Sequence, residues 1–253
     1  MHNDERTLCL IHGWGVDSRI WKGLAARLPV HWRIITLDLP GYGTSVISNP
    51  PAEIHIIADM LIPLIPRNAV LMGWSLGGMV AIKIARLLGG DINTLILLAS
   101  TPCFVKKKDW LHGIEPELIR TMADRLFDNT DRVLQEFIAL TAKGDVAPRQ
   151  TVRELRASAV YGVTYIKALM SGLDILREAD LRGDISDLKC RVVMLSGERD
   201  NLIAKKTGPA TQLLCPHMQL AYITAGHAPF SSQDKLTARM LIQHIRAHDR
   251  EQI

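Results

Sequence analysis

The residue with the clearest chemical signature is Ser75, the centre of a Gly-x-Ser-x-Gly motif at residues 73–77. An apolar run at 69–73 precedes it and an amphipathic stretch at 76–87 follows, so the serine is expected between a buried strand and a helix. A sharp turn there lifts the hydroxyl clear of the backbone, and the flanking glycines leave room for neighbouring elements. The pattern predicts a nucleophile, and the simpler alternative is that Ser75 only caps the helix.

A serine hydroxyl needs a base to take its proton and an acid to orient that base. For this motif the expected chain order is serine, acid, histidine. Asp200 follows the apolar run 191–196, and His227 follows the run 219–224. Both are therefore expected at the carboxyl ends of strands, where an open α/β sheet collects its site. We predict Ser75 as nucleophile, His227 as base and Asp200 as the orienting acid, with Glu198 as the alternative acid.

Acyl transfer also requires hydrogen-bond donors for the oxyanion. The first expected donor is the backbone N–H of Leu76, directly after the nucleophile. The second is the N–H of Trp14, in the loop 12–15 (His-Gly-Trp-Gly) that follows the first strand. A plain glycine turn is the alternative for this loop. We expect His12 to organise the loop by hydrogen bonding rather than to take part in the chemistry.

Alternating strand and helix patterns must position these residues. Strands are predicted at 7–11, 33–38, 69–73, 94–99, 191–196 and 219–224, and helices at 20–28, 53–64, 76–87 and 233–248. Between 103 and 184 the strand signal disappears, and helical patterns at 116–127, 131–142, 148–160 and 165–178 replace it. We predict an α/β core formed by residues 1–102 and 185–253, with a helical cap inserted at 103–184.

Composition and charge indicate the general class of the protein and which partners to expect. Of 253 residues 47% are hydrophobic and 22% charged, which is typical of a globular protein. The four scattered cysteines show no metal-type spacing, and no apolar run reaches the roughly 20 residues of a membrane span. A net charge of +4 is too small to indicate nucleic-acid binding. We therefore expect a cytoplasmic monomer without metal or cofactor, and without nucleic-acid or membrane partners.

Five stretches together resemble the α/β-hydrolase superfamily over nearly the whole chain. They are 12–15 (His-Gly-Trp-Gly), 38–45 (Asp-Leu-Pro-Gly-Tyr-Gly-Thr-Ser), 73–78 (Gly-Trp-Ser-Leu-Gly-Gly), 99–104 (Ala-Ser-Thr-Pro-Cys-Phe) and 226–230 (Gly-His-Ala-Pro-Phe). The likeness implies a mostly parallel central sheet with helices on both faces. Within the superfamily, the stretches are most similar to the family of pimeloyl-[acyl-carrier protein] methyl ester carboxylesterases of biotin synthesis.

This closer resemblance implies a serine esterase that frees a carboxylate and methanol through an acyl-enzyme. It implies that Trp14, Ser75 and Leu76 hold the ester. Five cap residues would line the acyl channel: Phe137, Ile138, Ala139, Leu140 and Thr141. Thr141 stands where the family has glutamine, so the polar contact of that residue would differ. The strands that usually precede the His-Gly loop are missing or shortened, which costs sheet edge rather than site residues.

The resemblance also implies an acyl-carrier protein as partner. Carrier proteins are acidic, and Arg149, Arg153 and Arg156 are spaced i, i+4 and i+7, on one face of a helix, where they match family arginines in part. Arg132 is a fourth candidate. A solvated helix face is the alternative, because the cap as a whole carries as many acidic as basic side chains.

Two other functions stay open at this point. A general short-chain carboxylesterase or thioesterase would use the same three residues, since one fold hosts many chemistries. A non-catalytic receptor that keeps the fold is the alternative from another class.

Overall fold

A parallel β-sheet forms the centre of the molecule. The computed structural model describes residues 5–250, with the backbone alone for 248–250. The strands are β1 (Thr7–Ile11), β2 (Arg33–Leu37), β3 (Ala69–Trp74), β4 (Ile92–Leu98), β5 (Arg191–Gly197) and β6 (Gln219–Ile223). Their order across the sheet is β2-β1-β3-β4-β5-β6, and each neighbouring pair is parallel. The carboxyl ends of all these strands therefore meet at one edge of the sheet.

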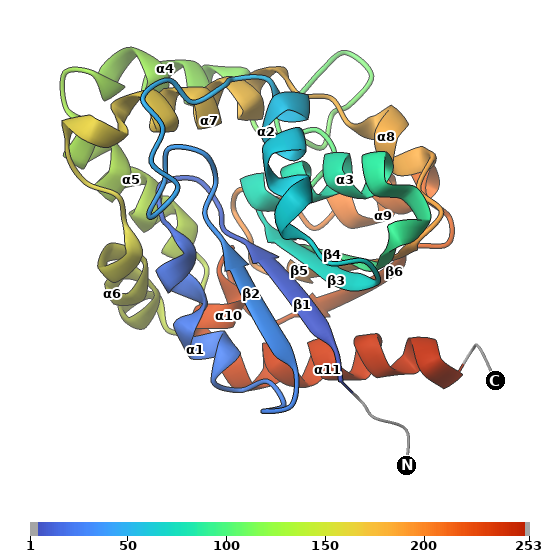
Figure 1. Ribbon diagram of the computed structural model, residues 1–253. Helices are drawn as coiled ribbons and strands as arrows, with labels where there is room; N and C mark the ends of the chain where they lie inside the picture. The colour runs from blue at the N-terminus through green and yellow to red at the C-terminus, as the bar shows by residue number, and fades with distance from the viewer. Residues whose placement is uncertain (1–4, 251–253) are drawn as a thin grey trace.

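The central strands are buried almost throughout, whereas the edge strands β2 and β6 are partly exposed. Successive side chains of a strand point to opposite sides, so each face of the sheet packs against its own core. Leu8 and Met72 belong to a core with α1 (Lys22–Ala25), α10 (Pro229–Ser232) and α11 (Asp234–Arg250). Cys9 and Leu71 belong to the opposite core, with α2 (Ile54–Leu61) and α3 (Leu76–Leu88). Figure 1 shows these two helix layers on either side of the strands. The architecture confirms the predicted α/β class.

Five helices separate β4 from β5. They are α4 (Pro116–Leu126), α5 (Thr130–Ala142), α6 (Pro148–Ser158), α7 (Ile166–Glu178) and α8 (Arg182–Ser186). The first and third begin on proline, whose missing N–H costs nothing at the first helical position. Four of these helices, α4 to α7, lie at one end of the sheet in Figure 1. The division of the chain into core and cap at residues 103 and 184 stays a prediction.

The predicted element boundaries hold to within two residues at most ends. The exceptions are the helix expected at 20–28, which is a 3-10 turn (Ser18–Trp21) followed by the short α1, and the end of the helix expected at 53–64, where Ile62–Leu64 is 3-10. Three short helices were not anticipated: α8, α9 (Thr207–Leu214) and α10. Helix α3 ends at Leu88 because Gly89 adopts a φ of +54°, which glycine tolerates without a Cβ clash.

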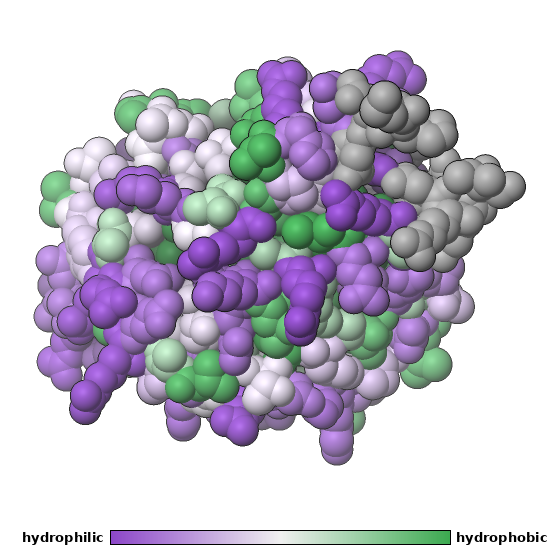
Figure 2. Space-filling view, turned by 90° about the horizontal axis from the view of Figure 1, so that it is seen from below, coloured by the Kyte–Doolittle hydropathy of each residue, from purple (hydrophilic) through white to green (hydrophobic). Residues whose placement is uncertain are grey.

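The face seen from below carries mixed side chains. Helix α11 runs along this side of the molecule (Figure 1), and Figure 2 shows hydrophobic residues there in small groups among hydrophilic ones. Within residues 5–250 no helix combines the length and the apolar character that crossing a bilayer requires.

Candidate active site

Ser75 occupies a strained turn between β3 and α3. Its φ of 54° and ψ of −118° lie in a region that residues other than glycine rarely adopt. The glycines around it allow the chain to approach itself: a Cβ on Gly73 would lie 2.1 Å from the Gly77 carbonyl oxygen. A Cβ on Gly77 would lie 2.3 Å from the His12 carbonyl oxygen. The motif is therefore required by backbone contacts on both sides of the serine.

The backbone of Ser75 is fixed by hydrogen bonds. Its N–H donates to the Leu98 carbonyl at 3.1 Å, and its carbonyl accepts from the Ser100 hydroxyl at 2.7 Å. The Ser75 side chain does not cap α3 and is 3% exposed. The helix-cap alternative for this serine is therefore wrong.

His227 and Asp200 form a buried pair. The His227 Nδ1 lies 2.8 Å from Asp200 Oδ2, and both side chains are fully buried. Asp200 Oδ1 accepts from the backbone N–H groups of Leu202 at 2.8 Å and Ile203 at 2.9 Å. Because a carboxylate can only accept here, Nδ1 carries a proton, and in the neutral tautomer that this contact selects Nε2 has the lone pair. That Nε2 atom is buried without a hydrogen-bond partner among the described residues.

The alternative acid, Glu198, faces away from this pair. Its carboxylate accepts from the Thr224 hydroxyl at 2.6 Å and lies 3.5 Å from the Lys205 amine, at the surface. The pKa of Glu198 is lowered, first by the Thr224 hydroxyl and then by the Lys205 charge. The structure thus brings Asp200, not Glu198, to the imidazole.

Trp74 holds the histidine loop and was missed by the sequence reasoning. Its Nε1 donates to the His227 carbonyl at 2.7 Å, and the two rings lie 5.6 Å apart. The same indole fills the space beside Gly13, where a Cβ would lie 2.8 Å from Trp74 Cε3. Its position inside the serine motif was the available signal, because that placement puts it at the end of β3.

His12 organises the loop after β1, as expected. Its Nδ1 lies 2.8 Å from the Gly13 carbonyl, which only accepts, and its Nε2 accepts from the Leu39 N–H at 3.0 Å. Both contacts require the neutral ring with the proton on Nδ1. Burial lowers the pKa of His12 and so favours the same state.

Trp14 links this loop to α7 and α5. Its indole Nε1 donates to the Leu169 carbonyl at 2.8 Å, and its ring meets Phe137 edge-on at 4.8 Å. The backbone N–H groups of Trp14 and Leu76 donate to no acceptor among residues 5–250. Among the described residues, the two predicted oxyanion donors are therefore without an acceptor and available to a substrate oxygen.

The run 137–141 of α5 divides between interior and surface. Phe137, Ile138 and Thr141 are buried, Leu140 is half-buried and Ala139 is exposed. The Thr141 hydroxyl is buried without a hydrogen-bond partner among the described residues. Ala139 instead lines an apolar groove of about 500 Å³ at the surface between α5 and α6, with Lys143 and Arg149 at its edge.

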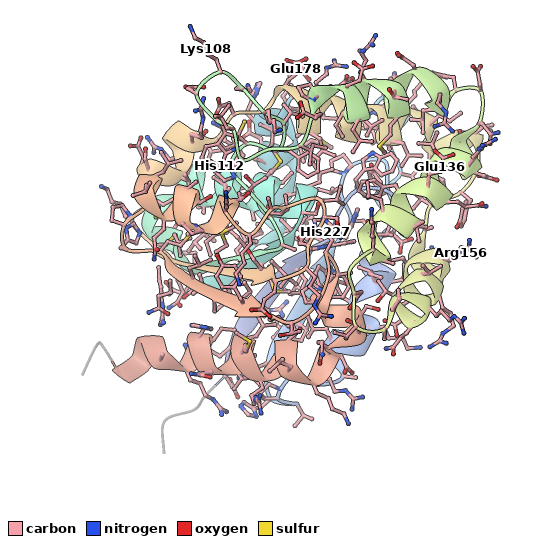
Figure 3. All side chains as sticks on the ribbon, turned by 180° about the vertical axis from the view of Figure 1, so that it is seen from behind. Lys108, His112, Glu136, Arg156, Glu178 and His227 are labelled. Carbon is pink, nitrogen blue, oxygen red and sulfur yellow. The ribbon has the colours of Figure 1, made fainter. Side chains whose placement is uncertain are left out.

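The four predicted docking arginines differ in their surroundings. Arg132 makes an ion pair with Glu136 on the same helix at 3.0 Å, and Glu136 also binds Arg125 at 2.8 Å. The other three are Arg149, Arg153 and Arg156, all exposed on α6. Figure 3 shows Arg156 at the outer edge of the molecule and His227 in its interior.

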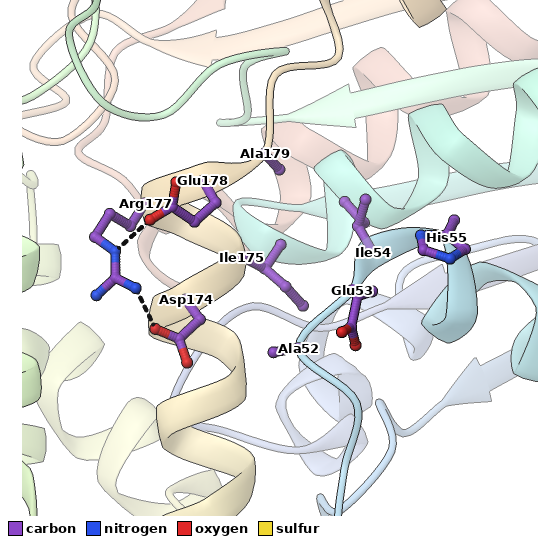
Figure 4. A pocket seen from close by; sticks show the side chains of 9 residues that line it. All are labelled: Ala52, Glu53, Ile54, His55, Asp174, Ile175, Arg177, Glu178 and Ala179. Atoms are coloured by element: carbon purple, nitrogen blue, oxygen red, sulfur yellow. Dashed lines mark hydrogen bonds and ion pairs between the residues drawn. The ribbon is translucent and has the colours of Figure 1, made fainter.

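A second groove, of about 430 Å³, lies between the start of α2 and α7 (Figure 4). Arg177 on its wall is paired with Asp174 at 2.8 Å and Glu178 at 2.7 Å. None of the predicted site residues lines it. Within residues 5–250 no three metal-type side chains come together.

Comparison with known sequences assigns the family. The model of the alpha/beta hydrolase family matches residues 10–240. A pimeloyl-[acyl-carrier protein] methyl ester esterase of Pseudoalteromonas atlantica is 35% identical over 227 residues, covering 88% of each chain. The esterase of the same name from Pectobacterium atrosepticum is 34% identical over 242 residues, covering 95% of this chain and 94% of that one.

Solved structures agree with the fold. The enol-lactonase of Burkholderia xenovorans superposes with a TM-score of 0.83 at 18% identity, covering 97% of this chain and 93% of that one. The esterase of Exiguobacterium antarcticum superposes with a TM-score of 0.79 at 19% identity, covering 95% and 92%. At this identity the likeness concerns the fold alone. Together with the match over residues 10–240, these findings show that the chain belongs to the alpha/beta hydrolase family.

Proposed function

We propose that this hydrolase is a serine carboxylesterase that cleaves the methyl ester of pimeloyl-[acyl-carrier protein] in biotin synthesis. The chemistry is supported by one arrangement. The His227–Asp200 pair, at 2.8 Å, leaves Nε2 of the imidazole without a partner among the described residues, and the indole of Trp74, the residue before Ser75, donates to the His227 carbonyl at 2.7 Å. The substrate rests on the relatives, which carry that activity in their names and match 88% or more of this chain.

In the proposed reaction the Ser75 hydroxyl attacks the ester carbonyl while His227 Nε2 takes its proton. Asp200 keeps the proton on Nδ1 and stabilises the imidazolium that forms. The imidazolium then protonates the methoxide leaving group, and methanol departs from an acyl-enzyme. A water molecule, activated by the same imidazole, hydrolyses the acyl-enzyme and releases the free pimeloyl carboxylate.

The oxyanion of each tetrahedral intermediate would be bound by the N–H groups of Trp14 and Leu76. Both amides lack other acceptors among the described residues, and Leu76 begins α3, whose N-terminus favours negative charge. Removing one such donor typically costs about 3 kcal/mol of transition-state stabilisation.

The acyl chain would lie against apolar residues of α5. Phe137 packs on Trp14 and therefore reaches the oxyanion loop, while Ile138 and Thr141 are buried on the same helix. The unpaired Thr141 hydroxyl is available for a polar contact with the chain. Ala139 faces solvent, so we assign it to the rim rather than to the interior of the channel.

The acyl-carrier protein would dock on α6. Arg149, Arg153 and Arg156 are exposed there and would meet its acidic surface. Arg132 is already paired with Glu136, so its contribution requires exchange of that partner.

Methanol release tests this function. The native protein is incubated with each of two esters. Methanol is measured from the pimeloyl-carrier methyl ester and p-nitrophenolate from p-nitrophenyl butyrate, and Ser75→Ala serves as control. We expect turnover of both by the native protein, a kcat/KM at least about tenfold higher for the carrier ester, and none by the variant. Preference for the nitrophenyl ester would favour a general short-chain esterase. No turnover of any ester by folded protein would favour a non-catalytic receptor.

A further inference from the structure

The turn between α5 and α6 contacts both loops that carry the acid and the base. The Asn201 side-chain amide donates to the Lys143 carbonyl at 2.8 Å. A Cβ on Gly144 would lie 2.3 Å from the Arg199 carbonyl oxygen, so the turn touches the backbone beside Asp200. A Cβ on Gly226, the residue before His227, would lie 3.1 Å from the backbone N of Asp145.

Asp145 ties this turn to the helix that follows the base. Asp145 is 8% exposed, and its carboxylate accepts from the Val146 N–H at 2.7 Å and the Thr151 hydroxyl at 2.8 Å. It also accepts from the hydroxyl of Ser232, in α10. Because α10 begins two residues after His227, these bonds join α6 to the histidine loop. A buried carboxylate holds such donors firmly, since leaving it without them is costly.

The inner face of α6 adds a second set of bonds to α10. The Gln150 side-chain amide donates to the Ser231 carbonyl at 2.9 Å and to Glu154 at 3.0 Å. The Ser231 hydroxyl donates to the Glu154 carboxylate at 2.6 Å. The exposed arginines and these bonds thus lie on different faces of one helix, with Arg156 directed outward in Figure 3.

We propose that the turn 143–145 and the inner face of α6 position both the acid and the base of the catalytic centre. We call these residues the brace: Lys143, Gly144, Asp145, Gln150, Thr151 and Glu154. None of these residues is assigned to touch the substrate's reacting atoms, so they act as positioning residues through Asp200 and His227. The inference rests on the proposed role of that pair. It goes further, because it makes the orientation of the pair depend on a segment more than 45 residues away in sequence. Misplacement of a catalytic group by about 1 Å can cost about 100-fold in rate.

Two glycines give a matched test. Gly144 and Gly162 both follow β4 in the inserted helical segment and both have positive φ, +86° and +99°. Alanine is strained at either position, but only at Gly144 does the new Cβ meet the acid loop, whereas nothing lies within 4 Å at Gly162. We expect Gly144→Ala to lower kcat for p-nitrophenyl butyrate about tenfold or more, with KM changed less than about twofold. Gly162→Ala should keep the native kcat.

A second matched pair covers the case in which Gly144→Ala fails to fold. Thr151→Val removes a hydroxyl that donates to Asp145, and Thr130→Val removes a buried hydroxyl that donates to the Leu126 carbonyl on the neighbouring helix. The first should slow labelling of Ser75 by a fluorophosphonate, and the second should not. Asp145→Ala should slow it further, and Asp145→Asn should recover most of that loss, because the amide keeps the shape and can still accept from Ser232.

These experiments distinguish a positioning effect of the brace from a general loss of stability. They also test the brace independently of the proposed substrate. Equal kcat for the two glycine variants, or equal labelling rates for the two threonine variants at matched Tm, would overturn the brace. The labelling and nitrophenyl assays do not use the carrier. If the native protein passes them but fails on the carrier ester, the substrate proposal falls while the brace is still tested.

Discussion

Replacing Asp200 by asparagine should reverse the tautomer of His227. Asp200 Oδ1 accepts two backbone N–H groups, from Leu202 and Ile203, and Oδ2 accepts from His227 Nδ1. In Asp200→Asn the amide oxygen must stay with the two backbone donors, because an NH₂ group there would face them without an acceptor. The NH₂ group then points at Nδ1. The imidazole must accept at Nδ1 and carry its proton on Nε2, where a base needs a lone pair.

Asp200→Asn should therefore lose much of the native kcat, although asparagine has nearly the same shape as aspartate. An acid-to-amide change that fixes the wrong tautomer costs about 10⁴-fold in kcat in serine hydrolases of this type, which is about 5 kcal/mol of barrier. The assay is kcat for p-nitrophenyl butyrate and for the carrier methyl ester at neutral pH, with Tm measured in parallel. Both substrates should lose activity by the same factor, since the step affected is proton transfer from Ser75.

Glu198→Gln is the matched control for this prediction. Glu198 lies two residues away, and its carboxylate contacts Thr224 and Lys205 at the surface, so we expect the variant to keep a kcat within about twofold of native. An Asp200→Asn protein that keeps more than about a tenth of native kcat would refute the tautomer reasoning. So would a loss in Glu198→Gln that equals the loss in Asp200→Asn.

Three further predictions concern folding, pH and docking. Gly77→Ala places a Cβ 2.3 Å from the His12 carbonyl oxygen and should lower the unfolding free energy by about 2 kcal/mol or more in urea titrations, whereas Gly90→Ala, with open space around it, should change it little. Burial lowers the pKa of His12, so the unfolded chain binds the proton more tightly, and the unfolding free energy should fall as the pH drops below about 6.5. Urea titrations between about pH 5 and 7.5 should show that slope, and a His12→Gln protein with the same slope would count against it. Reversing charge with Arg149→Glu and Arg153→Glu should raise KM for the carrier ester and spare p-nitrophenyl butyrate, and equal loss on both substrates would end the docking proposal.

The hydrophobic pattern was enough to predict the central strands because they are buried on both faces. Runs such as 69–73 and 191–196 are nearly continuous apolar residues between turn signals, and these predicted strands agree with β3 and β5. The short helices α8 and α10 were missed because four or five residues carry no helical period. Helix α9 has eight residues, but it consists of small and polar residues followed by two leucines and so shows little amphipathic pattern.

The candidate site was predictable in proportion to how local its signals are. The turn at Ser75 is encoded by adjacent glycines, and the positions of Asp200 and His227 follow from the strands before them. The serine motif places Trp74 at the end of β3, but its contact with the His227 carbonyl joins residues 153 apart, so the sequence around Trp74 does not predict that partner. The bonds of Asp145 to Thr151 and Ser232 were not predicted, because an aspartate in a polar turn has the composition of a solvated loop.

The central claim is that the hydroxyl of Ser75 is made nucleophilic by His227. Mass spectrometry of the native protein after brief exposure to a fluorophosphonate tests it most directly, with His227→Ala treated in parallel. We predict a single adduct on the peptide that contains Ser75 in the native protein, and labelling slower by about 1,000-fold or more in the variant. An adduct on another residue, or equal labelling of the folded variant, would contradict the account.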